Sequence, residues 1–526
     1  MIESNLSLIN MDYIVPSLLS RHAGVIYFAS ILVLASFICS NTAFAAPSIK
    51  DSNLQVNIVA TGLSKPTSMA FLGPNDILVL EKDTGIVKRV KNGVILPAPL
   101  LDLNVATSSE RGMLGIDVKR RGSSTTQFDV FLYYTLADDS GNAIANRLSK
   151  YILTVDSRLG PAQGRMSHVS TLLNLPATPG PNHDGGKVAI DPDANVYTVI
   201  GDLNRRTQAQ NVETGASPDG TGGILRVTQD GSTVGSGILG SSSPLNKYYA
   251  YGVCNSFGLD FDPVSGKLWH SENGAGSNDE INLVDPGFNS GWVDLMGMAP
   301  SGFNFNNLVN FGGKGKYSDP EFVWTQTVAP TAIEFLTSSK LGSSYQNDMF
   351  VGDFNKGRIY DFNLNSGRTA LSLSGDLADK IANTDAETGQ VIFGEGFGGV
   401  TDLKVGPGDG YLYVLSIGNG AIYKILPKSA SAASKSSSEE TSDSVKNPFA
   451  ENKESKKLKR DKDLAKETKK QKIKEKVDAL REQQQEQQLQ QQQEEEQGPQ
   501  EQQQQQLQDT SNAANQTIIE KNQGAE

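Results

Sequence analysis

Hydrophobic residues in the central part of the chain fall into short apolar runs separated by turns rich in Asp, Pro, Gly and Asn. Runs of this length, bounded by turn residues, predict β-strands joined as hairpins. Paired runs recur six times between Leu54 and Pro427, and the last five pairs are spaced by about 70 residues. The pairs are Ser68–Leu72 with Ile77–Leu80, Leu114–Val118 with Val130–Tyr134, Val188–Ile190 with Val196–Val199, Gly258–Phe261 with Lys267–Trp269, Ala332–Phe335 with Met349–Val351, and Leu403–Val405 with Tyr411–Leu415.

Several pairs are followed by a third apolar run that carries a basic residue, as in Gly85–Val90, Gly223–Val227 and Ala421–Ile425. A unit of about four strands is too small to bury both faces of its sheet, so the repeats must pack on one another. We therefore predict an all-β fold, a six-bladed β-propeller. A β-sandwich or barrel is the alternative, but neither requires six similar units. The long gaps between pairs predict loops over one face, where a functional site can be built on a rigid scaffold.

The chain divides into three predicted regions: residues 1–45 as a signal peptide, 46–428 as the propeller, and 429–526 as a low-complexity tail. Arg21 and His22 precede an apolar run, and Ala43–Ala45 fits a small-x-small cleavage site. An uncleaved membrane anchor is the alternative, but the run is shorter than the ~20 residues of a spanning helix. Cleavage would leave Cys254 as the only cysteine, without an internal disulfide. The prediction is an exported protein, secreted or held at the cell surface or in a periplasm-like space.

The tail differs sharply in composition, with a Ser-rich start, a basic block at Lys453–Lys476 and a Gln/Glu-rich stretch at Gln483–Gln508. Such a sequence buries too little apolar surface to offset its ordering entropy, which predicts a disordered or partly helical tail. The basic block is interpreted as a solvated charge run. For the whole chain, a net charge of −12 argues against nucleic acid as a partner.

His183 is the candidate for chemistry, because it lies in the loop Pro181–Lys187 directly before the strands of the third pair. A histidine displayed on such a loop can titrate near neutral pH and accept a proton from a substrate. A histidine that only hydrogen-bonds its own loop is the simpler alternative. The other histidines lack metal-ligand spacing, and Walker-type and dinucleotide-type glycine-rich loops are absent from the sequence.

Three further stretches fall in long gaps or at strand ends: Ser109–Gly115, Tyr251–Leu259 leading to Ser271–Leu283, and Phe322–Pro330. Together with Asn182-His183 and Asp202 at the end of the next strand, their order resembles the glucose/sorbosone dehydrogenase family. The resemblance covers roughly Leu54 to Lys428. It implies a six-bladed propeller that uses pyrroloquinoline quinone (PQQ) and calcium to oxidise a sugar.

The resemblance assigns His183 as the general base that removes the proton of the sugar C1 hydroxyl while hydride passes to the quinone. Asp202 matches the acid that orients this histidine, a sensible pairing because a carboxylate fixes the tautomer and stabilises the imidazolium. Asn182 and Asn255 match positions that contact the quinone. Trp324 and Thr327 match the neighbourhood of the quinone plane, and Glu110 stands in this cofactor region where a glutamine is common.

The turn Asn273-Gly274-Ala275 matches the segment whose backbone carbonyls bind the calcium linked to the quinone. Asp279 and Glu280 match acidic positions near it. Oxygen ligands on a loop rich in Asn, Gly and Asp suit calcium. A plain acidic turn is the alternative for this loop.

The departures from the family concern cations that would hold an anionic quinone. Cys254 stands where the family usually has arginine, Asn355 occupies a strand-end basic position with Lys356 one residue away, and Thr401 lies where some members place arginines. Each missing charge-assisted contact removes on the order of 1.5–3 kcal/mol of binding free energy.

The preferred hypothesis is an exported quinoprotein sugar dehydrogenase, acting on an aldose at C1 with an external electron acceptor. A non-catalytic surface propeller that binds carbohydrate or protein is the second hypothesis. A calcium-dependent hydrolase in which the same histidine activates water is the third, and no nucleophilic Ser or Cys motif supports it.

Overall fold

The computed structural model describes residues 46–428, so the predicted signal peptide (1–45) and tail (429–526) lie outside the described residues. Within 46–428 the chain forms six antiparallel-based sheets and little helix, α1 (Asp385–Thr388) being the one α-helix of this part. No helix in the described part has the length and apolar composition needed to cross a membrane.

The first three sheets follow in chain order. Sheet 1 contains β3 (Pro66–Gly73), β4 (Asp76–Glu81), β5 (Ile86–Lys91) and β6 (Val94–Ile95), with β7 (Leu101–Asp102) paired to β5. Sheet 2 contains β8 (Met113–Arg120), β9 (Gln127–Ala137), β10 (Ala143–Val155) and β11 (Gly164–Leu175). Sheet 3 contains β12 (Val188–Ile190), β13 (Val196–Ile200), β14 (Gly223–Val227), β15 (Tyr248–Tyr251), β19 (Phe288–Asn289) and β20 (Lys316–Tyr317).

The other three sheets include the N-terminal strands. Sheet 4 contains β16 (Gly258–Phe261), β17 (Leu268–Glu272), β18 (Asp279–Val284), β21 (Phe322–Trp324) and β25 (Ile381–Ala382). Sheet 5 contains β22 (Pro330–Phe335), β23 (Met349–Asp353), β24 (Ile359–Phe362), β26 (Ile392–Glu395) and β1 (Ser48–Ile49). Sheet 6 contains β27 (Val400–Val405), β28 (Leu412–Ser416), β29 (Ala421–Pro427) and β2 (Leu54–Thr61).

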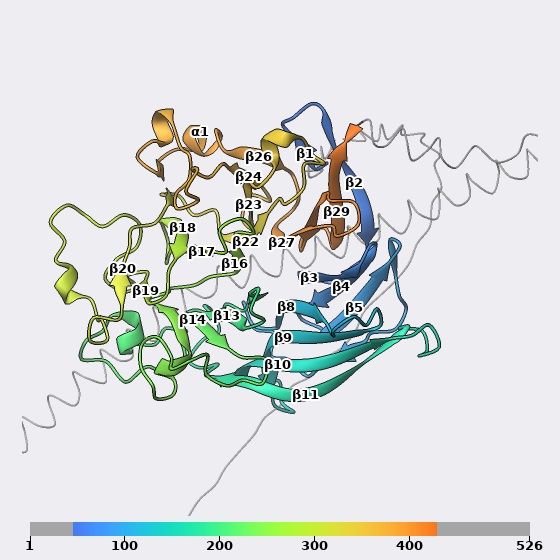
Figure 1. Cartoon of the computed structure of the whole chain (residues 1–526), viewed down its shortest axis with the longest axis horizontal. Coiled ribbons are helices and arrows are strands. Elements are labelled where there is room, and N and C mark those ends of the chain that lie inside the picture. The colour runs from blue at the N-terminus through green and yellow to red at the C-terminus, as the bar shows by residue number, and fades with distance from the viewer. Residues whose placement is uncertain (1–45, 429–526) are drawn as a thin grey trace, which may run out of the picture. The chain divides into compact units, whose positions relative to one another are not determined.

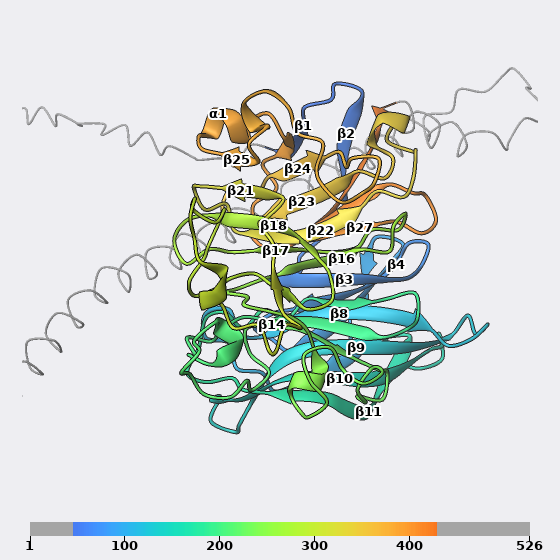
Figure 2. The same cartoon turned by 60° about the vertical axis from the view of Figure 1, so that its left-hand side comes forward.

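The first strands of the sheets contact one another in a closed sequence: β3 with β8, β8 with β12, β12 with β16, β16 with β22, β22 with β27, and β27 with β3. Figure 1 shows the sheets following one another around the molecule in chain order, and Figure 2 shows the same sheets from the side. The N-terminal β2 pairs antiparallel with the C-terminal β29, from Leu54 opposite Pro427 to Thr61 opposite Ala421. This pairing joins the two ends of the described chain in one sheet. The predicted all-β propeller arrangement is confirmed, and the count of six blades stays a prediction.

The hydrophobic core is divided among the spaces between neighbouring sheets. Each of the six hydrophobic clusters lies between two neighbouring sheets, from sheets 1 and 2 to sheets 5 and 6. The last cluster lies between sheets 6 and 1 and contains Met69, Ile77, Leu415 and Ile422. Strands covered on both faces must be apolar at consecutive positions, which explains the uninterrupted burial of β13 and β28. All six predicted hairpins are confirmed. The expectation of loops between the hairpins is wrong for the segment after the second hairpin. That segment contains the long strands β10 and β11.

Candidate active site

The loop that carries His183 is shaped by glycines at its contact with sheet 3. His183 has a positive φ of 65°, and Gly185 follows with φ of +61°. A Cβ on Gly185 would lie 2.6 Å from the carbonyl oxygen of Val199, and one on Gly201 would lie 2.6 Å from that of His183. Both distances are shorter than van der Waals contact, so only glycine lets this loop approach the end of β13.

His183 forms a hydrogen bond through Nδ1 to Asp202 Oδ1 at 2.6 Å, as the sequence predicted. Asp202 Oδ2 accepts a hydrogen bond from Trp292 Nε1 at 2.7 Å, and Oδ1 accepts another from the Asn204 backbone N–H at 2.8 Å. The Asp202 side chain is 2% exposed and that of His183 is 20% exposed. The carboxylate is therefore held by three partners, while the imidazole keeps one accessible edge.

The charges around His183 favour its protonated form. Burial lowers the pKa of His183, but the hydrogen bond and charge of Asp202, together with Glu110 and Asp184, outweigh it and raise the pKa above the ordinary value. The pKa of Asp202 is lowered, because its bonds to His183 and Trp292 outweigh the effect of burial. These shifts describe a histidine that can accept a proton and be stabilised as imidazolium.

Glu110 joins three of the stretches that the sequence singled out. Its Oε2 accepts a hydrogen bond from the His183 backbone N–H at 2.5 Å, and both carboxylate oxygens lie 3.1 Å from the Asn255 side-chain nitrogen. The neighbouring Ser109 hydroxyl donates to the Asn182 side-chain oxygen. Burial raises the pKa of Glu110 despite these bonds. Asn182, His183, Asn255 and Glu110 therefore lie together, and their role at a cofactor stays a prediction.

Asp184 is a buried carboxylate that sequence reasoning missed. Its Oδ1 accepts a hydrogen bond from Asn146 Nδ2 at 3.0 Å and lies 3.8 Å from Arg111 Nε, whereas Oδ2 has no partner among the described residues. Burial, with a smaller contribution from Glu110, raises the pKa of Asp184 to about 7. The one sequence feature that could have indicated Asp184 is its position directly after His183. Trp292 was also missed, and its distance along the chain from Asp202 left no signal.

The backbone of Cys254 links Asp202, the partner of His183, to Glu272, which directly precedes the Asn273–Glu280 loop. Its carbonyl accepts the Asp202 N–H at 2.9 Å, and its own N–H donates to Glu272 Oε1 at 2.6 Å. The thiol is fully buried, and burial, followed by the charges of Glu272 and Asp202, raises its pKa. A protonated, enclosed thiol is a poor nucleophile. It also supplies no positive charge where the resemblance leads us to expect an arginine.

The Asn273–Glu280 loop lies against Asn255, whose carbonyl accepts the Asn273 N–H at 2.7 Å. The side-chain oxygens of Asn255 and Asn273 are both buried without a hydrogen-bond partner among the described residues. Gly274 is required here, because a Cβ would lie 1.8 Å from the Ser277 carbonyl oxygen. Two orphaned amide oxygens beside a tight turn are acceptors available to a cation or to a ligand that donates hydrogen bonds.

The predicted metal-binding carboxylates are already engaged with protein donors. Asp279 Oδ1 accepts the Gly274 N–H at 2.8 Å, and Oδ2 accepts those of Val328 and Ala329 at 2.6 and 2.8 Å. Glu280 accepts the Gly297 N–H and the Asn282 side chain. Residues 46–428 contain no group of three or more His, Cys, Asp and Glu side chains arranged for a metal ion. The hydrogen bonds of Asp279 and Glu280 hold the loop in place, and the metal roles predicted for these two residues and for Gly274 and Ala275 stay predictions.

Trp324 lies in the core, where β21 places it opposite Asp279 of β18. It is fully buried in β21, and its ring packs edge-on against Phe322 and tilted against Tyr360. An apolar strand residue next to a quoted motif is explained here by packing between sheets 4 and 5.

Thr327 lies beside the Asn355 side chain, which donates to the Thr327 carbonyl at 3.4 Å. The Thr401 hydroxyl donates to the Pro66 carbonyl at 2.8 Å. Both Asn355 and Thr401 are therefore neutral and engaged with backbone, in agreement with the loss of cations noted in the sequence.

Comparison with known proteins agrees with this arrangement. The profile of the family described as glucose / sorbosone dehydrogenase matches residues 63–424. The chain belongs to the glucose/sorbosone dehydrogenase family. It is 25% identical over 403 residues to the aldose sugar dehydrogenase YliI of Escherichia coli, covering 75% of this chain and 98% of that protein.

Solved structures with this fold include the soluble aldose sugar dehydrogenase of Escherichia coli in the apo-form. That structure is 22% identical with a TM-score of 0.53, covering 71% of this chain and 100% of its own. The PQQ-bound form of an aldose sugar dehydrogenase from Streptomyces coelicolor is 24% identical with a TM-score of 0.52, covering 72% and 99%. At these identities the likeness establishes the fold.

Proposed function

We propose that this protein is a PQQ- and calcium-dependent aldose sugar dehydrogenase in which His183 is the general base. The hydrogen bond of 2.6 Å between His183 and the buried Asp202 carries the proposal, because it gives an accessible imidazole edge a fixed tautomer. Family membership supplies the reaction class, oxidation of a sugar at C1. We also propose that the six sheets are six blades, supported by the closed sequence of contacts among their first strands.

His183 would accept the proton of the C1 hydroxyl at Nε2, because Nδ1 is engaged with Asp202. Asp202 would stabilise the resulting imidazolium, and Trp292 and Asn204 would keep the carboxylate in place. The hydride released from C1 requires an acceptor, and PQQ, when bound, supplies that two-electron chemistry. An external acceptor would then reoxidise it.

The residues near the Asn273–Glu280 loop fit a bound calcium ion and quinone, whereas those around Glu110 and Cys254 do not favour an anionic quinone. The orphaned side-chain oxygens of Asn255 and Asn273, with the carbonyls of Gly274 and Ala275, would hold the calcium and the polar edge of the quinone. At the other end Glu110 places a carboxylate beside Asn255, and Cys254, Asn355 and Thr401 provide no cation. Quinone affinity in this protein would therefore depend strongly on calcium.

The test is reconstitution of the full chain with PQQ and calcium chloride, followed by dye-coupled oxidation of a panel of aldoses. We expect calcium-dependent turnover that His183→Ala abolishes, while His168→Ala, which changes an exposed histidine of β11, leaves it intact. Absence of turnover together with absence of any PQQ absorption change would refute the proposal. That pair of results would favour the non-catalytic propeller, for which the missing cations are the supporting observation.

A further inference from the structure

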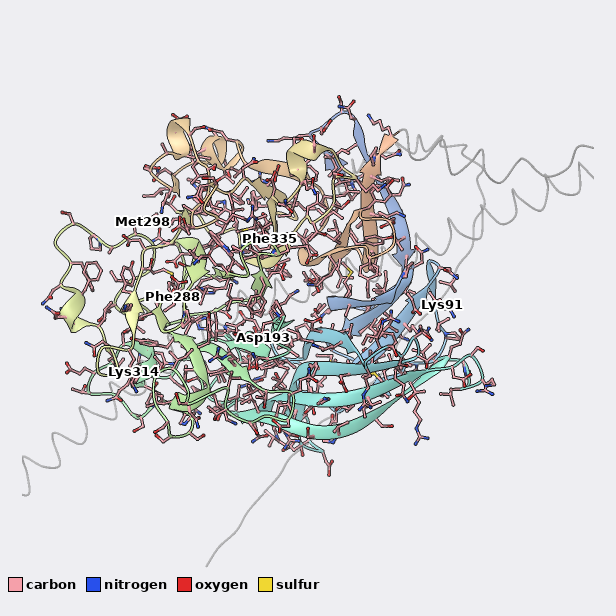
Figure 3. The ribbon with its side chains drawn as sticks, in the orientation of Figure 1. Lys91, Asp193, Phe288, Met298, Lys314 and Phe335 are labelled. Carbon is pink, nitrogen blue, oxygen red and sulfur yellow. The ribbon has the colours of Figure 1, made fainter. Side chains whose placement is uncertain are left out.

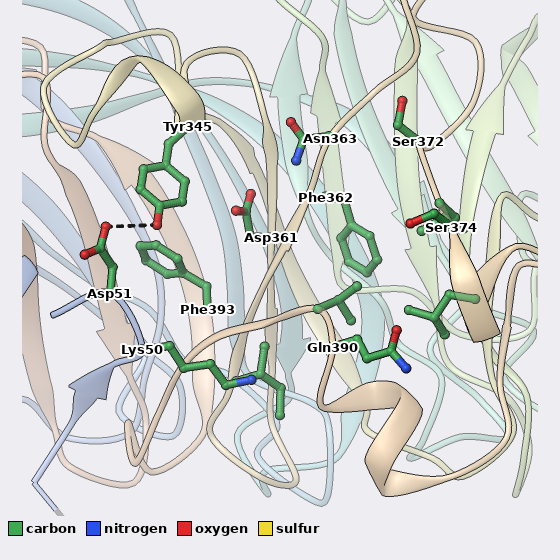
Figure 4. Close-up of a pocket in the computed structure, with 14 residues that line it drawn as sticks. Lys50, Asp51, Tyr345, Asp361, Phe362, Asn363, Ser372, Ser374, Gln390 and Phe393 are labelled. Carbon is green, nitrogen blue, oxygen red and sulfur yellow. Dashed lines mark hydrogen bonds between the residues drawn. The ribbon is translucent and has the colours of Figure 1, made fainter.

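A cavity lies on sheet 5, away from His183, and none of the residues described around His183 lines it. It has a volume of about 320 Å³ and is formed by the N-terminal strand region, β24, β26 and the segment 372–377. Figure 4 shows Asp361 in the middle of the cavity, with Tyr345 and Phe393 on one side and Phe362 on the other. The cavity therefore combines aromatic walls with a carboxylate at its centre.

Asp361 is an unsatisfied acceptor. It lies on β24 opposite Phe350 of β23. Its Oδ1 is shielded from solvent and has no hydrogen-bond partner among the described residues. A buried carboxylate oxygen without a donor costs free energy, so a ligand that brings a donor gains what the protein lacks.

A second carboxylate makes the cavity electrically negative. Asp348 is buried near Asp361, and its oxygens lie 3.0 and 3.3 Å from the Asn363 side-chain amide, which donates to them in its favourable orientation. Neither aspartate forms a salt bridge among residues 46–428, but the two are not equally free of cations. Burial raises the pKa of Asp348 to about 6, and the nearby charge of Arg368 opposes this rise. Burial first, and then the charge of Asp348, raise the pKa of Asp361 to about 8.

The remaining polar groups of the cavity do not neutralise Asp361. The Tyr345 hydroxyl donates to Asp51 Oδ2 at 3.1 Å, and the Lys50 ammonium donates to the Gly389 carbonyl at 2.5 Å. The Tyr345 and Phe393 rings meet edge to face with centroids 5.3 Å apart, forming an apolar wall. A ligand that fits must bring positive charge to Asp361 and hydrocarbon to this wall.

We propose that this cavity binds a small organic cation, with a primary ammonium group at Asp361 and an apolar body against Phe393 and Tyr345. A neutral polyol would satisfy the orphaned oxygen but would not compensate the negative charge that develops when Asp361 ionises beside Asp348. A metal ion would need more ligands, and the described residues contain no group of three or more metal-binding side chains. The aromatic wall of Tyr345 and Phe393 offers apolar surface to the hydrocarbon part of the ligand.

Isothermal titration of the full chain with n-butylammonium chloride at pH 9, where Asp361 with its pKa of about 8 is ionised, tests this site at constant ionic strength, with n-butanol as the neutral analogue. We expect butylammonium to bind at least about ten-fold more tightly than butanol, since the charge-assisted bond is absent from the alcohol. Asp361→Asn should remove this preference, and Asp193→Asn, a change at an exposed turn residue, should keep it. Equal affinity for the two probes, or an unchanged preference in Asp361→Asn, would overturn the proposal.

Three further measurements separate the alternatives. Lys50→Met removes the cation that lines the cavity and is expected to strengthen butylammonium binding, and weaker binding would count against the proposal. Affinity should also rise as the pH passes from 6 to 9, because Asp361, beside Asp348, Asp51, Tyr345 and Lys50, must ionise with its pKa of about 8. Displacement of butylammonium by calcium chloride would assign the cavity to a metal instead. Circular dichroism of each variant verifies that it is folded.

Discussion

Asp202→Asn is the substitution that most directly tests the geometry around His183. The Asp202 carboxylate accepts hydrogen bonds from Trp292 and Asn204 and pairs with His183 Nδ1. An asparagine at this position has one acceptor oxygen and one amide group. Its amide would therefore face at least one N–H donor, and the imidazolium would lose its negative partner.

The size of the effect follows from these contacts. A buried donor left without a partner costs about 1–3 kcal/mol. The raised pKa of His183 means that its protonated form stabilises the fold below the ordinary pKa of 6.5, and that this contribution disappears as the pH rises through the raised value. The lowered pKa of Asp202 gives a contribution that is present above 3.8 and lost as the pH falls through the lowered value. The difference in the free energy of unfolding between wild type and variant should therefore be largest between pH 3.8 and pH 6.5, and smaller at pH 8.

Urea unfolding at pH 5.5 and pH 8 measures this difference, and an NMR titration reports the pKa of His183 in both proteins. In the variant we expect the pKa of His183 to fall, because burial persists while the carboxylate charge is lost. Sugar oxidation by the reconstituted enzyme should decrease by about 10²-fold or more, the range associated with a general base. Asp193→Asn serves as the control, because Asp193 is exposed in the turn before β13 (Figure 3). An unchanged pKa of His183 in Asp202→Asn, or a stability difference independent of pH, would refute the reasoning.

Two other substitutions test the surroundings of this pair. Glu110→Gln should lower the pKa of His183, because the Glu110 carboxylate raises it, and an NMR titration measures this change. The same substitution removes a negative charge near the proposed quinone site. It should therefore strengthen PQQ binding by about ten-fold, as measured by fluorescence titration. Lys187→Met should destabilise the fold by about 3–5 kcal/mol in urea unfolding, because it leaves the fully buried Asp402 carboxylate without its ion pair. Lys314→Met, at the exposed periphery of Figure 3, should change stability by less than about 0.5 kcal/mol.

The fold was predictable because both faces of most strands are covered. Continuous apolar runs such as those of β13 and β28 identify the hairpins directly. The outer strands were harder to predict. The long strands β10 and β11 alternate between buried and exposed positions and lie in a stretch that the pattern assigned to loops.

The site was predictable where its partners are close in the sequence. His183 and Asp202 flank a single hairpin, so the geometry of β12 and β13 brings them together. Trp292 reaches the same carboxylate from a distant loop, and no local pattern encodes that contact. Trp324 packs in the core between sheets 4 and 5 and lies opposite Asp279, and its assignment to the neighbourhood of a quinone stays a prediction.

The acidic surroundings of His183 follow from how the fold holds the loop. Glu110 binds the His183 backbone and the Asn255 side chain at once, so its carboxylate links sheet 2, sheet 3 and the strand connection that leads to sheet 4. A glutamine could accept one of these bonds through its oxygen, but its amide group would face the other donor, which is either the His183 backbone N–H or the Asn255 side-chain nitrogen. The negative charge is therefore coupled to the architecture of the site, and its cost to an anionic cofactor must be offset locally. The unpartnered oxygens of Asn255 and Asn273 are the groups that can recruit a cation for this purpose. In the proposed enzyme, calcium at these oxygens would compensate for the cations that Cys254, Asn355 and Thr401 do not supply.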